Sequence, residues 1–282
     1  MVEQNRLLDV LTWVVLIAGI ALVGFPIYVT FVASTLTADQ VMQAPMTMIP
    51  GSHLVDNYRI ALLHGVGESA IPVGRMLFNS LMLALGISLG KISVSILSAF
   101  AVVYFRFPFR KIAFWMIFVT LMLPVEVRIM PTYKVVSDLG LINTRGGMIL
   151  PIIASATATF LFRQMFLTVP EELAEAARVD GARPMQFFRH ILLPLSMTTI
   201  AALFVIQFIY GWNQYLWPLL ITTDHNLTPI VVGVTQMISR SGDAATAWNL
   251  VMATVILAMI PPAFVVMLMQ RWFVKGLIET EK

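Results

Sequence analysis

Six apolar stretches of about twenty residues, separated by polar segments, constrain the fold of this chain more than any other sequence feature. A helix needs about 20 apolar residues to cross the hydrocarbon core of a membrane. Barrel strands alternate over about ten residues and do not fit such continuous runs. The sequence therefore predicts an all-α membrane protein with six transmembrane helices, at about residues 11–33, 77–104, 112–130, 148–166, 197–216 and 250–269.

Composition excludes several other classes of protein. Hydrophobic residues make up 59% of the chain and charged residues 12%, whereas soluble domains are roughly 45–50% apolar. The net charge is only +3 and no aromatic and basic stripe is present, so no nucleic-acid partner is expected. The absence of cysteine removes disulfides, thiolate metal sites and cysteine nucleophiles, and no metal site is expected.

The distribution of basic residues predicts the orientation, because these residues accumulate on the cytoplasmic side of the membrane. With both termini in the cytoplasm, five basic residues lie outside and two, Lys91 and Arg128, at membrane depth. The other eleven are cytoplasmic: Arg6, Arg106, Arg110, Lys111, Arg163, Arg178, Arg183, Arg189, Arg271, Lys275 and Lys282. This orientation also places the polar segment between the fourth and fifth spans in the cytoplasm.

That segment, at about residues 168–195, has the local signals of a first short helix. Thr168 and Glu171 have the spacing of a capping box, and Pro170 suits a first turn. Gly181 supplies the left-handed residue that commonly ends a helix. We therefore expect a helix at about 169–180.

A second short helix is expected to begin near Pro184. Its apolar residues recur at helical spacing and fall on one side: Phe187, Phe188, Ile191 and Leu192. The first helix carries small residues that permit close approach, at Ala174, Ala176 and Ala177. The two helices together predict a helical elbow. On composition alone the elbow fits an amphipathic connector on the inner leaflet.

The order of residues in the elbow favours a more specific interpretation. The segment from Glu175 to Pro194 reads EAARVDGARPMQFFRHILLP and resembles the EAA loop of ABC importer permeases. In that family the loop docks into a cleft of a cytoplasmic ATPase subunit. The resemblance implies an ATPase-coupling role for Glu175, Ala176, Ala177, Asp180, Gly181, Phe187 and Phe188.

The resemblance extends over nearly the whole chain. Asn79-Ser80, the run 121–133 and the stretch 212–219 are similar to the MalG-type branch of carbohydrate importers. SATATFLFRQ at 155–164, FIYGWNQYLWPLLI at 208–221 and the final QRWFVKGL are closer still to permeases that import sn-glycerol 3-phosphate, with glycerophosphodiesters as a further cargo. The implied fold is that of a type I (MetI-like) ABC importer permease. A permease for sugars or oligosaccharides is the nearest alternative.

The family also implies partners in a bacterial inner membrane. These are membrane lipid, a second permease subunit that forms a pseudo-symmetric heterodimer with this chain, two ATPase subunits, and a periplasmic binding protein that meets the outer loop at about 35–75. ATP and Mg²⁺ belong to the ATPase subunits, and no cofactor is expected on this chain. The nearest imitation of a phosphate loop, 86–92, has three residues between its glycines where four are required, and Ile92 replaces the Ser or Thr.

An enzyme is the alternative from a different class. Ser88 and Lys91 form an S-x-x-K spacing inside the second span, and a desolvated lysine can activate a serine. No accompanying motif is present, and a hydrolase leaves the elbow unexplained. Gly86, Ser88 and Gly90 also fit a small-residue face for close helix packing.

Three charged residues at membrane depth are candidates for the substrate path. Lys91 is costly in the middle of a span and faces either the pathway or a partner group between helices. Glu126 and Arg128 lie two residues apart between Pro124 and Pro131, so they do not face each other on a regular helix. Arg128 is the better phosphate ligand, because its guanidinium group binds bidentately.

The outer end of the fifth span supplies a second group of candidates: Asn213, Gln214, Tyr215 and Trp217. Aromatic residues at that depth are commonly interfacial. Polyol and sugar sites also combine aromatic rings with amides. Because Asn213 and Gln214 are costly against lipid, we expect both to face inward.

Overall fold

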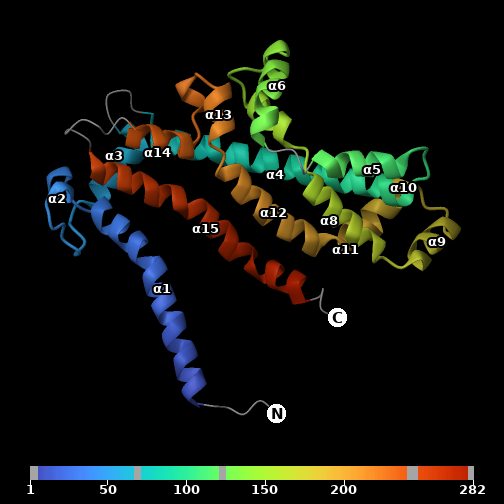
Figure 1. Cartoon of the computed structure of the whole chain (residues 1–282), viewed down its shortest axis with the longest axis horizontal. Coiled ribbons are helices and arrows are strands. Elements are labelled where there is room, and N and C mark those ends of the chain that lie inside the picture. The colour runs from blue at the N-terminus through green and yellow to red at the C-terminus, as the bar shows by residue number, and fades with distance from the viewer. Residues whose placement is uncertain (1–5, 67–70, 121–124, 240–246, 279–282) are drawn as a thin grey trace. The chain divides into compact units, whose positions relative to one another are not determined.

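The structure, a computed structural model, describes residues 6–66, 71–120, 125–239 and 247–278. For residues 6–9, 125–126 and 271–278 it describes the backbone and not the side chains. Within these ranges the elements are helices and no strand occurs (Figure 1). The chain divides into two compact units, and each is considered by itself.

The first unit comprises residues up to Met76 and 233–260. It contains α1 (Arg6–Ser34), α2 (Ala38–Met42), α3 (Leu54–His64), the start of α4 (Val73–Tyr104), most of α14 (Ile230–Ser239) and the first part of α15 (Trp248–Ile278). Buried Asn57 joins its segments: its amide donates to the carbonyls of Ser34 and Leu36 at 2.9 and 2.8 Å, and its oxygen accepts from Asn249 at 3.0 Å.

The second unit comprises residues 77–232 and the end of α15. Its helices pack around the remainder of α4. They are α5 (Arg110–Val119), α6 (Val125–Asp138), α7 (Arg145–Ile149), η2 (Leu150–Ile152), α8 (Ala156–Leu167), α9 (Glu171–Val179), α10 (Pro184–Phe187), η3 (Phe188–Leu192), α11 (Leu193–Leu195), α12 (Met197–Trp212), α13 (Leu216–Ile221) and η4 (His225–Leu227).

Three of the six expected spans correspond to long helices. α1, α4 and α15 contain apolar segments at Val10–Ser34, Val73–Tyr104 and Trp248–Gln270 that are long enough to cross a membrane. Two bent helix pairs in the described residues bring the total to as many as five. The division into six spans remains a prediction.

The other three expected spans are not single straight helices. In the fourth, α7 and η2 meet α8 at a bend of 49°, because Pro151 lacks an amide donor and the Ser155 hydroxyl accepts from Ala158 to begin a new helix. The fifth ends at Trp212 rather than 216, and the segment before it is bent from α12 by 73°. The third contains α5 and α6, and residues 121–124 lie outside the described part.

Small residues set the packing against α4, as the sequence predicted for Gly86 and Gly90. A Cβ atom on Gly86 would lie 2.6 Å from Ile149 Cδ1, and one on Gly90 would lie 2.5 Å from Ile153 Cγ2. On α12, a Cβ atom on Gly211 would lie 2.8 Å from the Cα atom of Ala84. Because this last neighbour is backbone, it cannot turn away as a flexible side chain would. Gly211 therefore fixes how closely α12 approaches α4.

We expect Gly211→Ala to destabilise the second unit by about 1–3 kcal/mol, the usual cost of overpacking. The measurement is the thermal unfolding midpoint of the detergent-purified protein. Gly19→Ala is the matched control, because a Cβ atom at Gly19 meets no atom of the described residues within 4 Å. Equal midpoints for the two variants would contradict the close approach of α12 to α4.

Candidate functional site

The predicted elbow is present, and Gly181 forms its turn. Gly181 has φ +71°, in the left-handed region that glycine favours. Its amide donates to the Arg178 carbonyl at 3.0 Å, and the amide of Ala182 donates to the Ala177 carbonyl at 2.9 Å. This is the Schellman pattern of a helix end. Figure 1 shows α9 and α10 near the C-terminal end of α4.

The expected capping box at Thr168 and Glu171 is wrong. Thr168 ends α8 instead, and its hydroxyl donates to the Met165 carbonyl at 2.7 Å. Pro170 is the N-terminal cap residue of α9, without a side-chain hydrogen bond. The chain leaves α8 at Thr168, so Pro170 and not Thr168 occupies the position from which a side chain would cap α9. Glu171 and Glu172 do occupy the first turn of α9, where carboxylates complement the helix dipole.

The elbow residues divide into an exposed and an inward-facing group. Glu175, Ala176, Asp180 and Gly181 are exposed. Ala177, Phe187 and Phe188 are buried within the chain. The assignment of all seven to ATPase coupling remains a prediction. The first four are exposed, and Ala177 and Phe187 line a cavity of about 210 Å³ between the elbow and the end of α4.

The two buried phenylalanines anchor the elbow to α4. The Phe188 ring lies 5.0 Å from that of Phe100, and the Phe187 ring lies 5.2 Å from that of Tyr104, measured between centroids. These are favourable distances for tilted aromatic pairs. The elbow therefore packs directly against the end of α4 through these side chains.

A second candidate region is a cavity of about 250 Å³ between α4, α6, η2, α12 and α13. It contains four of the predicted substrate-path residues, Lys91, Arg128, Gln214 and Trp217, together with Thr132 and Tyr210. No carboxylate is among its lining residues in the described ranges. The cavity is therefore lined by two cations and several polar groups.

Lys91 finds its partner in an aromatic ring. Its side chain is 7% exposed, and its Nζ atom lies 3.6 Å from the centroid of the Tyr210 ring. Such a cation–π contact offsets part of the cost of burying an ammonium group. Tyr210 was not singled out from the sequence. The available signal was its position four residues before Gln214, which places both residues on the same side of a helix.

The two amide residues after α12 differ in their surroundings. The side-chain amides of Asn213 and Gln214 donate to the backbone carbonyls of Ile209 and Tyr210 at 3.0 and 3.2 Å, at the end of the helix. Gln214 is half-buried and reaches the cavity, as predicted. The Asn213 side chain is exposed where the helix ends, and its place in the substrate path stays a prediction.

The two aromatic candidates next to them also differ from each other. Tyr215 is exposed and does not line the cavity. Trp217 is buried, and its indole N–H donates to the Gly147 carbonyl at 3.2 Å, so it holds α13 against α7. The side chain of Glu126 lies outside the described part of the structure.

The geometry of Ser88 and Lys91 does not support a hydrolase. The Ser88 hydroxyl donates to the Leu85 carbonyl at 3.2 Å, while the Lys91 ammonium group lies over Tyr210. A serine nucleophile needs its base within hydrogen-bond reach. The small-residue packing of α4 accounts for this segment instead.

The fold is shared with solved transporters. A chain of a bacterial ABC transporter involved in the import of the acidic polysaccharide alginate superposes with a TM-score of 0.83, at 19% identity, covering 97% of this chain and 99% of that one. A chain of a bacterial alginate ABC transporter in complex with an alginate pentasaccharide-bound periplasmic protein superposes with a TM-score of 0.63, at 16% identity, covering 95% of this chain and 94% of that one. The expected ABC importer permease fold is confirmed.

Sequence relatives give a closer match over the full length. The sn-glycerol-3-phosphate transport system permease protein UgpE of Pectobacterium atrosepticum is 61% identical over 282 residues, with 100% of both chains covered. The proteins of the same name from Brucella melitensis and Agrobacterium fabrum are each 59% identical over 283 residues, again with complete coverage.

A family model for the inner membrane component of binding-protein-dependent transport systems matches residues 91–279. Such a component is a multi-pass permease of the inner membrane and not an enzyme. Nucleotide is used by ATPase partners, and a periplasmic binding protein delivers the cargo. The chain belongs to the family of binding-protein-dependent transport system inner membrane components.

Proposed function

We propose that this chain translocates sn-glycerol 3-phosphate, and glycerophosphodiesters, as one of two permease subunits of an ATP-driven importer. The observation that carries the proposal is the cavity in which Lys91 and Arg128 occur together without a carboxylate among the described lining residues. Relatives of 58–61% identity that are named for this cargo support it. A neutral sugar, unlike a phosphorylated cargo, would leave the two cations of the cavity without an anionic ligand.

The chemistry of the cavity matches the two ends of the cargo. A phosphate monoester carries nearly two negative charges at neutral pH. Arg128 can bind phosphate oxygens bidentately, and Lys91 adds a compact positive charge. Thr132 and Gln214 offer hydrogen-bonding groups to the glycerol hydroxyls. The Tyr210 ring contacts the Lys91 ammonium group and leaves its positive charge in place.

The proposed assembly places both termini in the cytoplasm, because that orientation puts most basic residues inside. A UgpA-like permease completes the pathway, two UgpC-like ATPases lie beneath the elbow, and a UgpB-like periplasmic protein delivers the cargo. Glu175, Ala176, Asp180 and Gly181 form the exposed face that docks on an ATPase. Closure of the ATPases moves the elbow, and Phe187 and Phe188 transmit that movement to α4.

Identification of the cargo is tested with the complete importer in proteoliposomes. The measurement is ATPase stimulation by the cognate binding protein loaded with sn-glycerol 3-phosphate, with a glycerophosphodiester or with maltose. We expect stimulation by the phosphorylated ligands. Stimulation by maltose alone would replace the proposal with the sugar alternative.

We expect Arg128→Gln to reduce uptake of sn-glycerol 3-phosphate by roughly 10- to 100-fold, because a charge-assisted hydrogen bond contributes about 1.5–3 kcal/mol. Stimulation of the ATPase by loaded binding protein should remain, because the elbow is unchanged. Arg145→Gln is the control, since this arginine lies 5.3 Å from the Phe78 ring and does not line the cavity. Equal uptake by the two variants would remove Arg128 from the substrate path.

We expect Glu175→Lys to lower uptake by about tenfold or more, because reversing an exposed interfacial charge replaces attraction with repulsion. ATP hydrolysis by the assembled complex should fall with it. Glu172→Lys makes the same charge change on the same helix and serves as the control. If both variants lose the same activity, the effect belongs to the charge of α9 in general and the assignment of Glu175 fails.

A further inference from the structure

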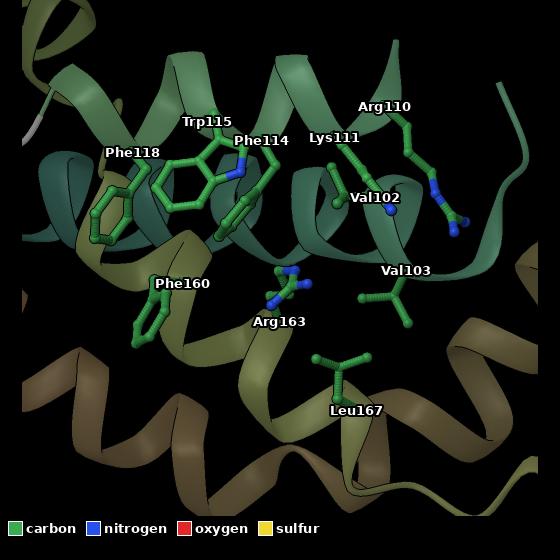
Figure 2. A pocket seen from close by; sticks show the side chains of 10 residues that line it. All are labelled: Val102, Val103, Arg110, Lys111, Phe114, Trp115, Phe118, Phe160, Arg163 and Leu167. Carbon is green, nitrogen blue, oxygen red and sulfur yellow. The ribbon is translucent and has the colours of Figure 1, made fainter. Parts of the chain in front are cut away.

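A separate cavity of about 370 Å³ lies between the C-terminal end of α4, α5 and α8, away from the substrate-path candidates (Figure 2). Three cationic residues, Arg110, Lys111 and Arg163, line it. They are joined by apolar and aromatic side chains, and no acidic residue is among the described lining residues. A ligand that fills this cavity would meet both cationic groups and aromatic rings.

The three cations are not neutralised by the described part of the chain. The Arg163 guanidinium carbon lies 4.5 Å from the centroid of the Phe114 ring. Arg110 donates one hydrogen bond to the Phe105 carbonyl at 3.2 Å. The ion pair that the described side chains do form, Lys134 with Asp138, belongs to α6. The cavity therefore presents net positive charge.

Two of the rings and two of the charges occupy opposite ends of the cavity. Figure 2 shows Phe118 and Phe160 at one end, Arg110 and Lys111 at the other, and Arg163 between them. The rings of Phe118 and Phe160 lie 5.8 Å apart. The site is thus amphipathic along its length.

The position of the cavity relates it to the membrane surface. It adjoins the end of the apolar segment of α4, which extends to Tyr104, and the start of α5 at Arg110. Trp115, on its rim, is 60% exposed, and tryptophan concentrates at the level of lipid headgroups. With the orientation proposed above, this end of α4 faces the cytoplasmic leaflet, whose anionic lipids attract basic residues.

We propose that the cavity binds one anionic phospholipid of the cytoplasmic leaflet. Its phosphate contacts Arg110, Lys111 and Arg163, and an acyl chain lies along Phe118 and Phe160. The assignment to the cytoplasmic leaflet rests on the orientation given with the proposed function. Lipid binding itself does not require transport. Inorganic phosphate satisfies the cationic end only, and an acidic segment of a partner protein leaves the aromatic end without an apolar ligand.

The assembled importer is tested for lipid retention by native mass spectrometry after equilibration with vesicles of phosphatidylglycerol and phosphatidylcholine. We expect preferential retention of phosphatidylglycerol. Lys111→Gln and Arg163→Gln should each reduce the retention of phosphatidylglycerol about fivefold, because this is the usual contribution of one basic residue near an anionic surface. Arg145→Gln should retain as much lipid as the unaltered protein, because Arg145 is not part of the cavity.

Equal retention of the two lipids, unchanged retention in the Lys111→Gln/Arg163→Gln double variant, or complete displacement by inorganic phosphate would overturn the proposal. A photo-crosslinking residue in place of Trp115 provides a second readout. Crosslinks to phosphatidylglycerol support the lipid site, and crosslinks to a partner subunit instead overturn it. Retention is measured without cargo or ATP, so a failure of transport in the same preparation bears on the proposed function alone.

Discussion

The buried ammonium group of Lys91 imposes the main constraint on the second unit. A lysine near the middle of a span costs roughly 2.5–3.5 kcal/mol on insertion scales, so the helices around it must supply a partner. Tyr210 supplies it through the face of its ring, 3.6 Å away. This contact requires α12 to approach α4 closely, which Gly211 permits. The cavity with Arg128 and Gln214 follows from that packing.

The same helix connects this cavity to the elbow. Lys91 lies in the middle of α4, and Phe100 and Tyr104 near its end hold Phe188 and Phe187 of the elbow. In the proposed mechanism, α4 carries displacement of the elbow to the level of Lys91. The two phenylalanines are buried within the chain against α4, whereas Glu175 is exposed.

How much the sequence predicted depends on the range of the interactions involved. The long helices and the turn at Gly181 were predictable, because span length, hydropathy and a left-handed glycine are local properties. The bend at Ser155 and the early end of α12 were not, since they depend on which side chains satisfy nearby backbone groups. Thr168 was misassigned for the same reason. Tyr210 was missed because its pairing with Lys91 arises only from tertiary packing.

In the proposed function, the phosphate of the cargo passes between Lys91 and Arg128. The most direct measurement is a structure of the assembled importer, with its binding protein and a nonhydrolysable nucleotide, trapped with sn-glycerol 3-phosphate. We expect phosphate density within hydrogen-bond distance of both side chains, with the Lys91 ammonium group turned from Tyr210 toward it. Cargo density bound wholly by the second permease, with Lys91 still seated on Tyr210, would contradict it.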